Sequence, residues 1–401
     1  MTDGSRARRP NPVWLGLGVV GWVGLIWLGI QMYSATPRTA GFDLELLLQA
    51  GRDVAAGQSP YDPSMVAGGA PGAADLFYSY PPPVAQAMSL FAAVPSAVMF
   101  WALWVLAIAG LAYGAALVSR RLDPGRSLSA TVIPTLAVAP LFLPFGIALL
   151  FGNLDALFPL AYSLVLLAAV APTPRSSVAG GVALGVATVA KVHPAGLGPW
   201  FVGRLLRERK EGQPAAWLRV IVAAAATVGA VLGLSLLAGG ADLWRDYVPV
   251  AGAASNARLL DPRNVGPAAQ VAMLLGGDEA LVRTLHLPVA LAAVLASLWA
   301  GWAVRDRLLG IAIAGIVSLV LLPVTWYHYP TALIPFAIAA IVRARRSSAA
   351  PRTTALIAAA AVVATLSIAW VPGLWLAVGL GLAGVAASAG AGAGTSKPPV
   401  G

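Results

Sequence analysis

The chain has 401 residues, of which 59% are apolar and only 10% are charged. An ordinary soluble domain has about 25% charged residues, and a soluble protein of this size could not bury so much apolar surface. The composition therefore excludes a soluble enzyme, a DNA-binding domain and a disordered protein. We expect an all-α polytopic membrane protein, because helices satisfy their own backbone hydrogen bonds in lipid.

The basic residues account for the net charge of +10. They stand in short clusters between the apolar runs, as topology signals do, so we expect no nucleic-acid partner. The clusters are Arg6, Arg8 and Arg9; Arg120, Arg121 and Arg126; Arg175; Arg204, Arg207, Arg209, Lys210 and Arg219; Arg305 and Arg307; and Arg343, Arg345, Arg346 and Arg352. The chain contains no cysteine, which excludes disulfides and thiol chemistry.

The first apolar run, residues 13–32, is long enough to span a bilayer, and its basic start places the N-terminus in the cytoplasm. If each later basic cluster is also cytoplasmic, pairs of spans separate neighbouring clusters, which gives about twelve transmembrane helices. Hinges are expected at Gly152-Asn153, Lys191–Pro194, Trp326–His328 and Pro372-Gly373. The pair over 177–206 is the shortest, but a single span there would place most basic residues outside.

This topology leaves two long loops on the outer side, over residues 33–83 and 239–279. Within the first loop, residues 43–56 have leucines at amphipathic helical spacing, so we expect a helix on the membrane surface. Most acidic residues also fall on this side, which indicates that polar chemistry takes place there. Residues 1–390 are interpreted as one integral-membrane domain, followed by a disordered Gly/Ala/Pro-rich tail, 391–401.

Asp43 lies shortly after the first span, close to the predicted outer membrane surface. A partly desolvated carboxylate there could act as a general base. Alternatively, Asp43 is a solvated acid or the N-cap of the amphipathic helix, since Asp is a favoured capping residue.

Two further positions combine charge or histidine with a helix break. Lys191 and His193 lie at the tip of the short hairpin, where a lysine is costly unless it faces water or a partner such as a lipid phosphate. The alternative is that Lys191 snorkels to the interface. His328 follows Trp326 in an aromatic cluster and could bind phosphate, move a proton or be structural.

Aromatic and polar residues of the loops offer candidate acceptor contacts. Tyr78 and Tyr80 belong to the stretch 77–83, which is either an interfacial aromatic belt or a platform for sugar rings or a lipid chain. Tyr61 lies in a turn, and Gly152–Asp155 and Asp261–Asn264 are polar spots. The three histidines, His193, His286 and His328, lack metal-ligand spacing, and there is no P-loop, so neither a metal nor a cofactor is expected.

Taken in order, these motifs resemble glycosyltransferase family 87, the polyprenyl-phosphate-mannose-dependent α-mannosyltransferases of actinobacteria. The resemblance covers roughly residues 10–345. It rests on Phe42-Asp43, Gly57-Gln58-Ser59-Pro60-Tyr61, Tyr80-Pro81-Pro82, Gly152-Asn153, Lys191-Val192-His193-Pro194, Arg263-Asn264 and Trp326-Tyr327-His328. The chain departs from the family in having Asn153 where the family has Gln, His328-Tyr329 for a His-His pair, and Asn264-Val265-Gly266 in the late loop.

The resemblance implies a GT-C fold in the cell membrane, with an extracytoplasmic active site. The implied reaction is the inverting transfer of mannose from a polyprenyl phosphate to a glycolipid or lipid-linked glycan. Asp43 would be the catalytic base, and Lys191 would meet the leaving phosphate. The donor contacts are then expected at Lys191, His193, Arg263, Trp326 and His328. The acceptor contacts are expected at Tyr61, Tyr78, Tyr80, Asn153, Asp155 and Asn264.

Two other functions stay open from the sequence. A multi-pass transporter or flippase of a lipid-linked or small polar substrate would keep ionisable residues near the bilayer midplane and would show repeats. The ionisable residues here gather at the outer surface and no repeat is visible, although Lys191 in its short hairpin favours transport. A non-catalytic membrane scaffold is the third interpretation.

Overall fold

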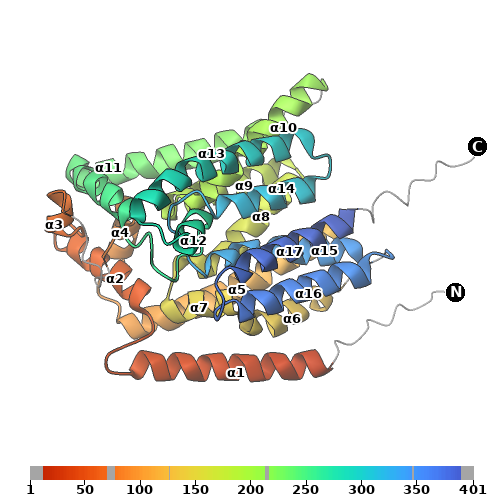
Figure 1. The fold of residues 1–401 in the computed structure, drawn as a ribbon, viewed down its shortest axis with the longest axis horizontal. Helices are drawn as coiled ribbons and strands as arrows, with labels where there is room; N and C mark the ends of the chain where they lie inside the picture. Colours follow the sequence, from red (N-terminus) through yellow and green to blue (C-terminus); the bar gives the residue numbers. More distant parts are fainter. Residues whose placement is uncertain (1–11, 70–76, 126, 213–215, 346, 390–401) are drawn as a thin grey trace, which may run out of the picture.

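The computed structural model describes residues 12–69, 77–125, 127–212, 216–345 and 347–389. Most helices run roughly along the long axis of the molecule (Figure 1), while α2 (Phe42–Ala55), α3 (Pro63–Val66) and α4 (Pro82–Ser89) gather at one end, the loop end. The opposite end carries Arg121, Arg204, Arg307 and Arg343 and is called the basic end. The predicted disordered tail, 391–401, lies outside the described residues.

Four helices are long and apolar enough to cross a membrane: α1 (Pro12–Ser34), α5 (Ser96–Leu122), α11 (Ala216–Asn256) and α13 (Glu279–Ala303). The helices α6 (Ser129–Val138) and α7 (Leu143–Phe151), joined by the 3₁₀ turn η1 (Ala139–Leu141), form a fifth candidate, bent by 72°. The chain is therefore an all-helical multi-pass membrane protein in its described residues.

The remaining bundle helices are shorter. They are α8 (Phe158–Val170), α9 (Pro174–Ala190), α10 (Gly198–Lys210), α14 (Arg307–Ser318), α15 (Ile334–Ala344), α16 (Ala350–Leu366) and α17 (Gly373–Ala389). Short 3₁₀ turns precede three of them: η2 (Leu154–Leu157), η3 (His193–Leu197) and η4 (Tyr329–Leu333). Because these helices are short, the count of about twelve spans stays a prediction.

The predicted break at Lys191–Pro194 is confirmed, since α9 ends at Ala190 and the chain returns in α10. The far end of α10 reaches the basic end, where Arg204 Nη1 donates to the Val304 carbonyl at 3.4 Å. Glu208 of the same helix lies 3.5 Å from Arg307, at the start of α14. The two arms therefore form a hairpin whose tip lies at the loop end.

The first outer loop is built differently from what we expected. The amphipathic helix is confirmed as α2, which is followed by Gly57 with a positive φ of 72°. The expected contact of its apolar face with lipid is wrong, because Leu44, Leu47 and Leu48 are buried inside the protein, against α4 and the main core. The apolar face of α2 thus packs on protein rather than on lipid.

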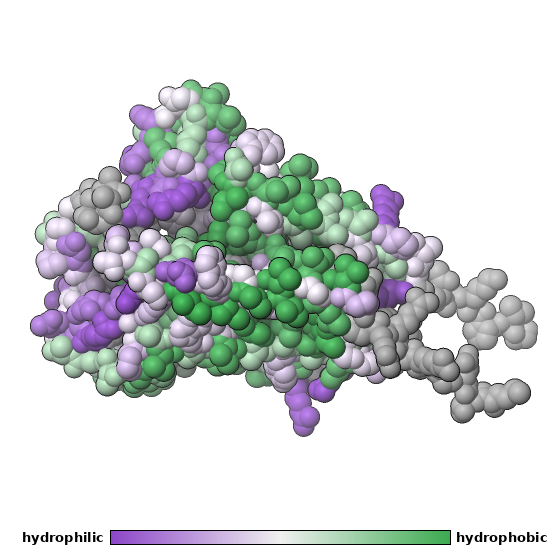
Figure 2. All heavy atoms as spheres, turned by 90° about the horizontal axis from the view of Figure 1, so that it is seen from below, coloured by the Kyte–Doolittle hydropathy of each residue, from purple (hydrophilic) through white to green (hydrophobic). Residues whose placement is uncertain are grey.

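The second outer loop, predicted over 239–279, is largely helical. A kink at Gly240, whose φ is 69°, lets α11 continue to Asn256, and α12 (Pro267–Leu274) follows. Apolar side chains of α1, α5, α11 and α13 remain exposed along the bundle, for example Val20 and Leu237. Figure 2 shows this apolar surface over the middle of the molecule, with hydrophilic residues concentrated at the loop end.

Candidate functional site

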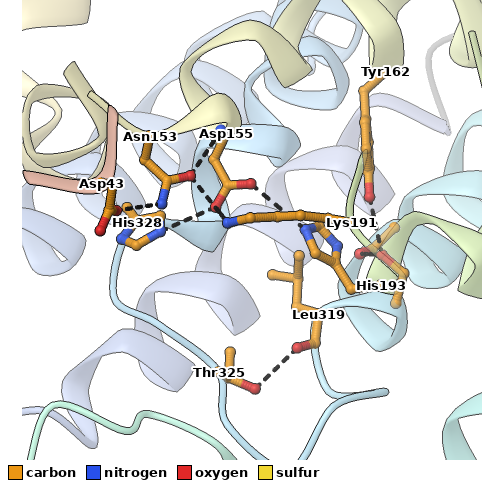
Figure 3. Close-up of polar contacts among 11 residues, drawn as sticks. Asp43, Asn153, Asp155, Tyr162, Lys191, His193, Leu319, Thr325 and His328 are labelled. Carbon is orange, nitrogen blue, oxygen red and sulfur yellow. Dashed lines mark hydrogen bonds and ion pairs between the residues drawn. The ribbon is translucent and has the colours of Figure 1, made fainter. Parts of the chain in front are cut away.

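A cluster of polar side chains lies at the loop end, where several helices stop (Figure 3). Asp43 comes from the first turn of α2, while Asn153 and Asp155 come from the turn between α7 and α8. Lys191 follows the last residue of α9, and His328 precedes η4. Irregular backbone inside a membrane protein is tolerated where protein surrounds it, so the breaks in these helices create the site.

Gly152 explains why Asp43 and Asn153 meet. Its φ of 69° ends α7 in a left-handed conformation that favours glycine. A side chain at this position would also bring a Cβ to 2.7 Å from the Cβ of Leu44. Glycine therefore lets α2 approach the turn closely, which puts Asp43 beside Asn153.

Asp155 is the central charged residue of this cluster. Its side chain is fully buried, and its Oδ2 lies 2.9 Å from Lys191 Nζ and 3.1 Å from His328 Nε2. Its Oδ1 faces His193 Nε2 at 3.8 Å. A buried carboxylate needs such partners, because burying an isolated charge is costly. Asp155 thus holds together three segments that are far apart in the sequence.

Asn153 connects Asp43 to this charge cluster. Its Nδ2 donates to Asp43 Oδ2 at 2.6 Å, and its Oδ1 accepts from Lys191 Nζ at 3.0 Å and from the Asp155 backbone N–H at 3.0 Å. Because two donors converge on one amide atom, that atom must be the oxygen, which sets the orientation of the amide. The amide therefore presents its N–H to the carboxylate of Asp43.

Aromatic rings enclose the lysine. Lys191 Nζ lies 4.8 Å from the centre of the Tyr329 ring and 5.9 Å from that of Tyr80. The His193 ring stacks on Tyr329 with 4.7 Å between centres and meets the edge of Phe158. Cation–π contacts of this kind help to hold a lysine that is mostly removed from water. Tyr80 is thus the predicted acceptor tyrosine that reaches the cluster.

Three predicted acceptor residues have structural positions instead. Tyr61 and Tyr78 are buried in a small core with Met65 and Val84, so neither ring offers a free face to a sugar. Asn264 is fully buried, and its side chain makes four hydrogen bonds that join the 259–266 segment to 323–325. Its amide has no capacity left for a substrate.

Arg263 and Trp326 lie toward the surface. Arg263 is 70% exposed and makes a two-bond contact with Asp261, which raises the pKa of the arginine and lowers that of the carboxyl. Its Cζ also lies 5.9 Å from the centre of the Trp326 ring. The Trp326 carbonyl accepts from the Tyr329 N–H at 3.0 Å, but no hydrogen bond or ion pair described for the side chains of Arg263 and Trp326 reaches Asp155 or Lys191. These two side chains therefore form a patch beside the site.

Sequence reasoning missed the central place of Asp155 and the contribution of Tyr329. Asp155 stands two residues after Asn153, and only the packing of α9 and η4 against that turn reveals its three partners. Tyr329 is adjacent to His328, which was the one available signal. Within the described ranges, no group of three or more His, Asp or Glu side chains has an arrangement that could hold a metal ion.

The arrangement supplies a carboxylate and a cation within one hydrogen-bonded unit. Asp43 Oδ2 accepts a hydrogen bond from the Asn153 amide. Among the described residues no cation forms an ion pair with Asp43, so its carboxylate is available as a proton acceptor. The lysine uses two of its three N–H groups on Asn153 and Asp155 and keeps one donor for an anion. Such a pair suits group transfer in which a hydroxyl loses a proton and an anion leaves.

Comparison with known proteins gives the class of this chain. The model of glycosyltransferase family 87 matches residues 78–324, which is more than half of the chain and includes Asn153, Asp155, Lys191 and His193. No curated protein matches the chain. Asp43 and His328 lie outside the matched range but in contact with residues inside it. The chain belongs to glycosyltransferase family 87 and is a membrane glycosyltransferase.

Proposed function

We propose that this protein transfers mannose from a polyprenyl-phosphate donor to a glycolipid or lipid-linked glycan, with inversion, on the extracytoplasmic face of the plasma membrane. The observation that carries this proposal is the hydrogen-bonded path from Asp43 through Asn153 to Lys191. The path joins a candidate base to a candidate phosphate-binding cation. Asn153 and Lys191 of this path lie within the range matched by the family model, which supports a site shared with the family.

Asp43 is the proposed general base. Its carboxylate takes the proton of the acceptor hydroxyl as that oxygen forms a bond to C1 of the mannose. The bond between C1 and the phosphate oxygen breaks at the same time, and its electron pair leaves with the polyprenyl phosphate. Attack from the face opposite to the leaving group gives an α-mannoside from a β-linked donor. The Asn153 amide holds the carboxylate in place for this step.

Lys191 and His328 are the proposed contacts of the donor phosphate. Lys191 has one N–H left over after Asn153 and Asp155, and its side chain is 9% exposed, so an anion at that position would be poorly screened by water. Charge on the leaving phosphate increases as the C1–O bond breaks, and a cation aimed at that position stabilises the transition state more than the ground state. His328 lies beside the same Asp155 oxygen.

The distribution of charged residues supports an extracytoplasmic position for the site. The site lies at the loop end, and the clustered arginines lie at the opposite end. Lysines and arginines accumulate in cytoplasmic loops of membrane proteins. This supports the loop end as the outer face, where lipid-linked sugars rather than nucleotide sugars would be the donors.

A transporter of a lipid-linked or polar substrate is the second candidate. The observation that favours it is the buried pair of Lys191 and Asp155 at breaks between short helices, which is a common feature of transporters. A transporter would move its substrate without forming a covalent product.

The test uses the purified full-length chain in detergent with polyprenyl-phosphate-[14C]mannose and a glycolipid extract. We expect labelled glycolipid from this donor and none from GDP-[14C]mannose. The Asp43→Asn variant should lose about 10²- to 10⁴-fold in rate. Asp53→Asn is the matched control, because Asp53 is a partly exposed residue of the same helix that bonds to Gln49, and it should keep the wild-type rate.

Three outcomes would overturn the proposal. Transfer from the nucleotide sugar alone would exclude the lipid donor. A wild-type rate of transfer in the Asp43→Asn variant would show that Asp43 is not the general base. Uptake of substrate by proteoliposomes without any covalent product would establish the transporter instead.

A further inference from the structure

Arginines gather around the turn that joins α13 to α14, at the basic end of the bundle, which is the right-hand end of Figure 1. Arg204 Nη1 of α10 donates to the Val304 carbonyl at 3.4 Å. Arg207 Nη1, further along α10, donates to the Trp302 carbonyl at 3.3 Å. The others belong to the turn itself, to the start of α14 and to the end of α15: Arg305, Arg307 and Arg343. Three separate parts of the chain therefore bring positive charge to one turn.

The carboxylates around this turn do not balance the arginines. Ion pairs with N–O distances of 2.7–3.7 Å join the arginines to three carboxylates: Glu208, Glu211 and Asp306. Glu208 serves two cations, since it lies 3.7 Å from Arg204 and 3.5 Å from Arg307. Among the described residues, five arginines thus meet three carboxylates, and a surplus of positive charge remains. Like charges held close together repel, and they repel more strongly where water is partly excluded.

These arginines differ in how many of their N–H groups are occupied. Arg343 is saturated, because its N–H groups all donate to a carboxylate, a serine hydroxyl or a carbonyl. Arg307 makes one long contact, from Nη2 to Glu208 at 3.5 Å. Arg305 is exposed, and no hydrogen bond or ion pair joins it to another described residue. Arg305 and Arg307 therefore have donors to spare.

Arg305 and Arg307 line a cavity of about 340 Å³, which we call the basic-end cavity. The rest of its lining consists of apolar side chains at the ends of α5 and α8 and the start of α14, and of one ion pair: Leu122, Val170, Leu308, Asp306 and Arg343. Both oxygens of Asp306 accept from Arg343, so this pair is closed on itself. The cavity thus offers a ligand two cations with spare donors beside an apolar wall.

We propose that the basic-end cavity binds a phosphate group, which Arg305 and Arg307 hold between them. A guanidinium presents its N–H groups in a planar fork that matches two oxygens of a phosphate, so two guanidinium groups can hold one phosphate. The negative charge of the phosphate offsets the surplus of positive charge at the turn. Because the cavity lies at the opposite end of the bundle from Lys191, this phosphate is distinct from that of the sugar donor, and the inference is independent of sugar transfer.

A phospholipid headgroup and a free phosphate ion offer the same chemistry to the two arginines. The apolar wall favours the phospholipid, because Leu122, Val170 and Leu308 can contact the carbon atoms next to its phosphate. Basic pockets between transmembrane helices on the cytoplasmic side bind anionic headgroups in other membrane proteins, and the clustered arginines predict that side here. A bound phosphate stabilises the folded chain by mass action, because the unfolded chain lacks the cavity.

The test follows thermal unfolding of the full chain in a neutral detergent as ligands are added. The probes are dioctanoyl phosphatidylglycerol, dioctanoylglycerol, which lacks the phosphate, sodium phosphate, and sodium chloride at matched ionic strength. We expect phosphatidylglycerol to raise the unfolding temperature with a saturable concentration dependence, from which an apparent Kd is obtained. Dioctanoylglycerol and chloride should not produce this saturable rise.

Variants of the two arginines assign the effect to the cavity. Arg305→Gln and Arg307→Gln should each weaken the apparent Kd for phosphatidylglycerol by about tenfold, the loss expected for one charge-assisted contact. Arg209→Gln is the matched control, because Arg209 is an exposed arginine in the last turn of α10 that does not line the cavity. It removes the same charge and should keep the wild-type Kd. Arg305→Gln is the cleaner variant, because Arg307 also contacts Glu208.

The outcomes separate a phosphate site from a general effect of charge or of lipid. An equal loss of binding in Arg209→Gln and Arg305→Gln would overturn the inference, because net charge alone would then explain the effect. Equal stabilisation by dioctanoylglycerol, or none by either phosphate probe, would also overturn it. Saturable stabilisation by sodium phosphate that matches that by phosphatidylglycerol and is weakened in Arg305→Gln would support the site and identify free phosphate as a sufficient ligand.

Discussion

The two ends of the bundle both contain charged side chains at low exposure, but they use them differently. At the basic end, Arg343 pairs with Asp306 at 2.7 Å, and Arg204 and Arg307 share Glu208. These contacts join helix ends, where each cation meets a carboxylate or a carbonyl. At the loop end, Asp155 meets Lys191 and two histidines in the gap left by broken helices, and Asp43 accepts a hydrogen bond from the Asn153 amide.

The difference shows which charges are available for chemistry. A pair that closes on itself stabilises the positions of two helices and offers little to a substrate. The loop end instead combines a carboxylate that has no ion pair among the described residues with a lysine that keeps one N–H donor beyond its bonds to Asn153 and Asp155. If this distinction is correct, substitutions at the loop end should change transfer, while those at the basic end should change stability alone.

The largest effect is expected at Lys191. Replacing it in Lys191→Met leaves the fully buried Asp155 carboxylate without its closest cation, which should lower the free energy of unfolding by about 3–5 kcal/mol. Thermal unfolding in detergent measures this. Arg207→Met, which breaks a partly exposed pair with Glu211, is the control and should cost less than about 1 kcal/mol.

A second substitution makes the Lys191 prediction specific. Asp155→Asn added to Lys191→Met removes the buried charge and should restore part of the stability but none of the transfer. An equal loss of stability in Lys191→Met and Arg207→Met would mean that the loop-end pair is no different from a surface pair.

The next largest effect is expected at Asn153. Asn153→Leu removes the bridge between Asp43 and Lys191, so the base loses its positioning partner. We expect kcat to fall by about 10- to 100-fold, the size of effect that misplacement of a reacting group produces. Asn153→Gln keeps the amide and should recover part of the rate. Comparable rates for the Leu and Gln variants would show that the amide does not position the base.

At the basic end, Arg343→Met should act on stability only. It removes a partly exposed ion pair with Asp306 and a hydrogen bond to the buried Ser388, and should cost about 1–3 kcal/mol. The rate of transfer per folded molecule should match that of the wild type. A reduced rate with normal stability would place this end in the reaction and break the contrast between the two ends.

The smallest effect concerns pH. The arginine contact lowers the pKa of Asp261 in the folded state, so its stabilisation is present above the unfolded pKa of about 3.9 and is lost as the pH falls through the folded value. Arg263 is 70% exposed, so we expect less than about 1 kcal/mol. Asp261→Asn should remove this part of the acid dependence of thermal unfolding. A steeper acid dependence in that variant would contradict the assignment.

Composition and periodicity were sufficient for the class of fold and for several breaks. The apolar runs, the amphipathic helix after Phe42, the break at Lys191–Pro194 and the hinge at Pro372-Gly373 all match the structure. They could be predicted because Gly and Pro restrict the backbone locally and apolar spacing reflects helical geometry. The surface against which the apolar face of α2 packs could not be predicted, because such a face is compatible with lipid and with protein alike.

The candidate site shows the same division. The sequence by itself determined which residues were chemically able to act, since Asp43, Asn153, Lys191 and His328 all stand beside helix breaks. Only the tertiary structure decided that Asp155 pairs with Lys191 and that Tyr61, Tyr78 and Asn264 are structural. The physical reason is that burial and pairing depend on the packing of α2, α7, α9 and η4 against one another. That packing joins residues more than a hundred positions apart, for which local spacing carries no signal.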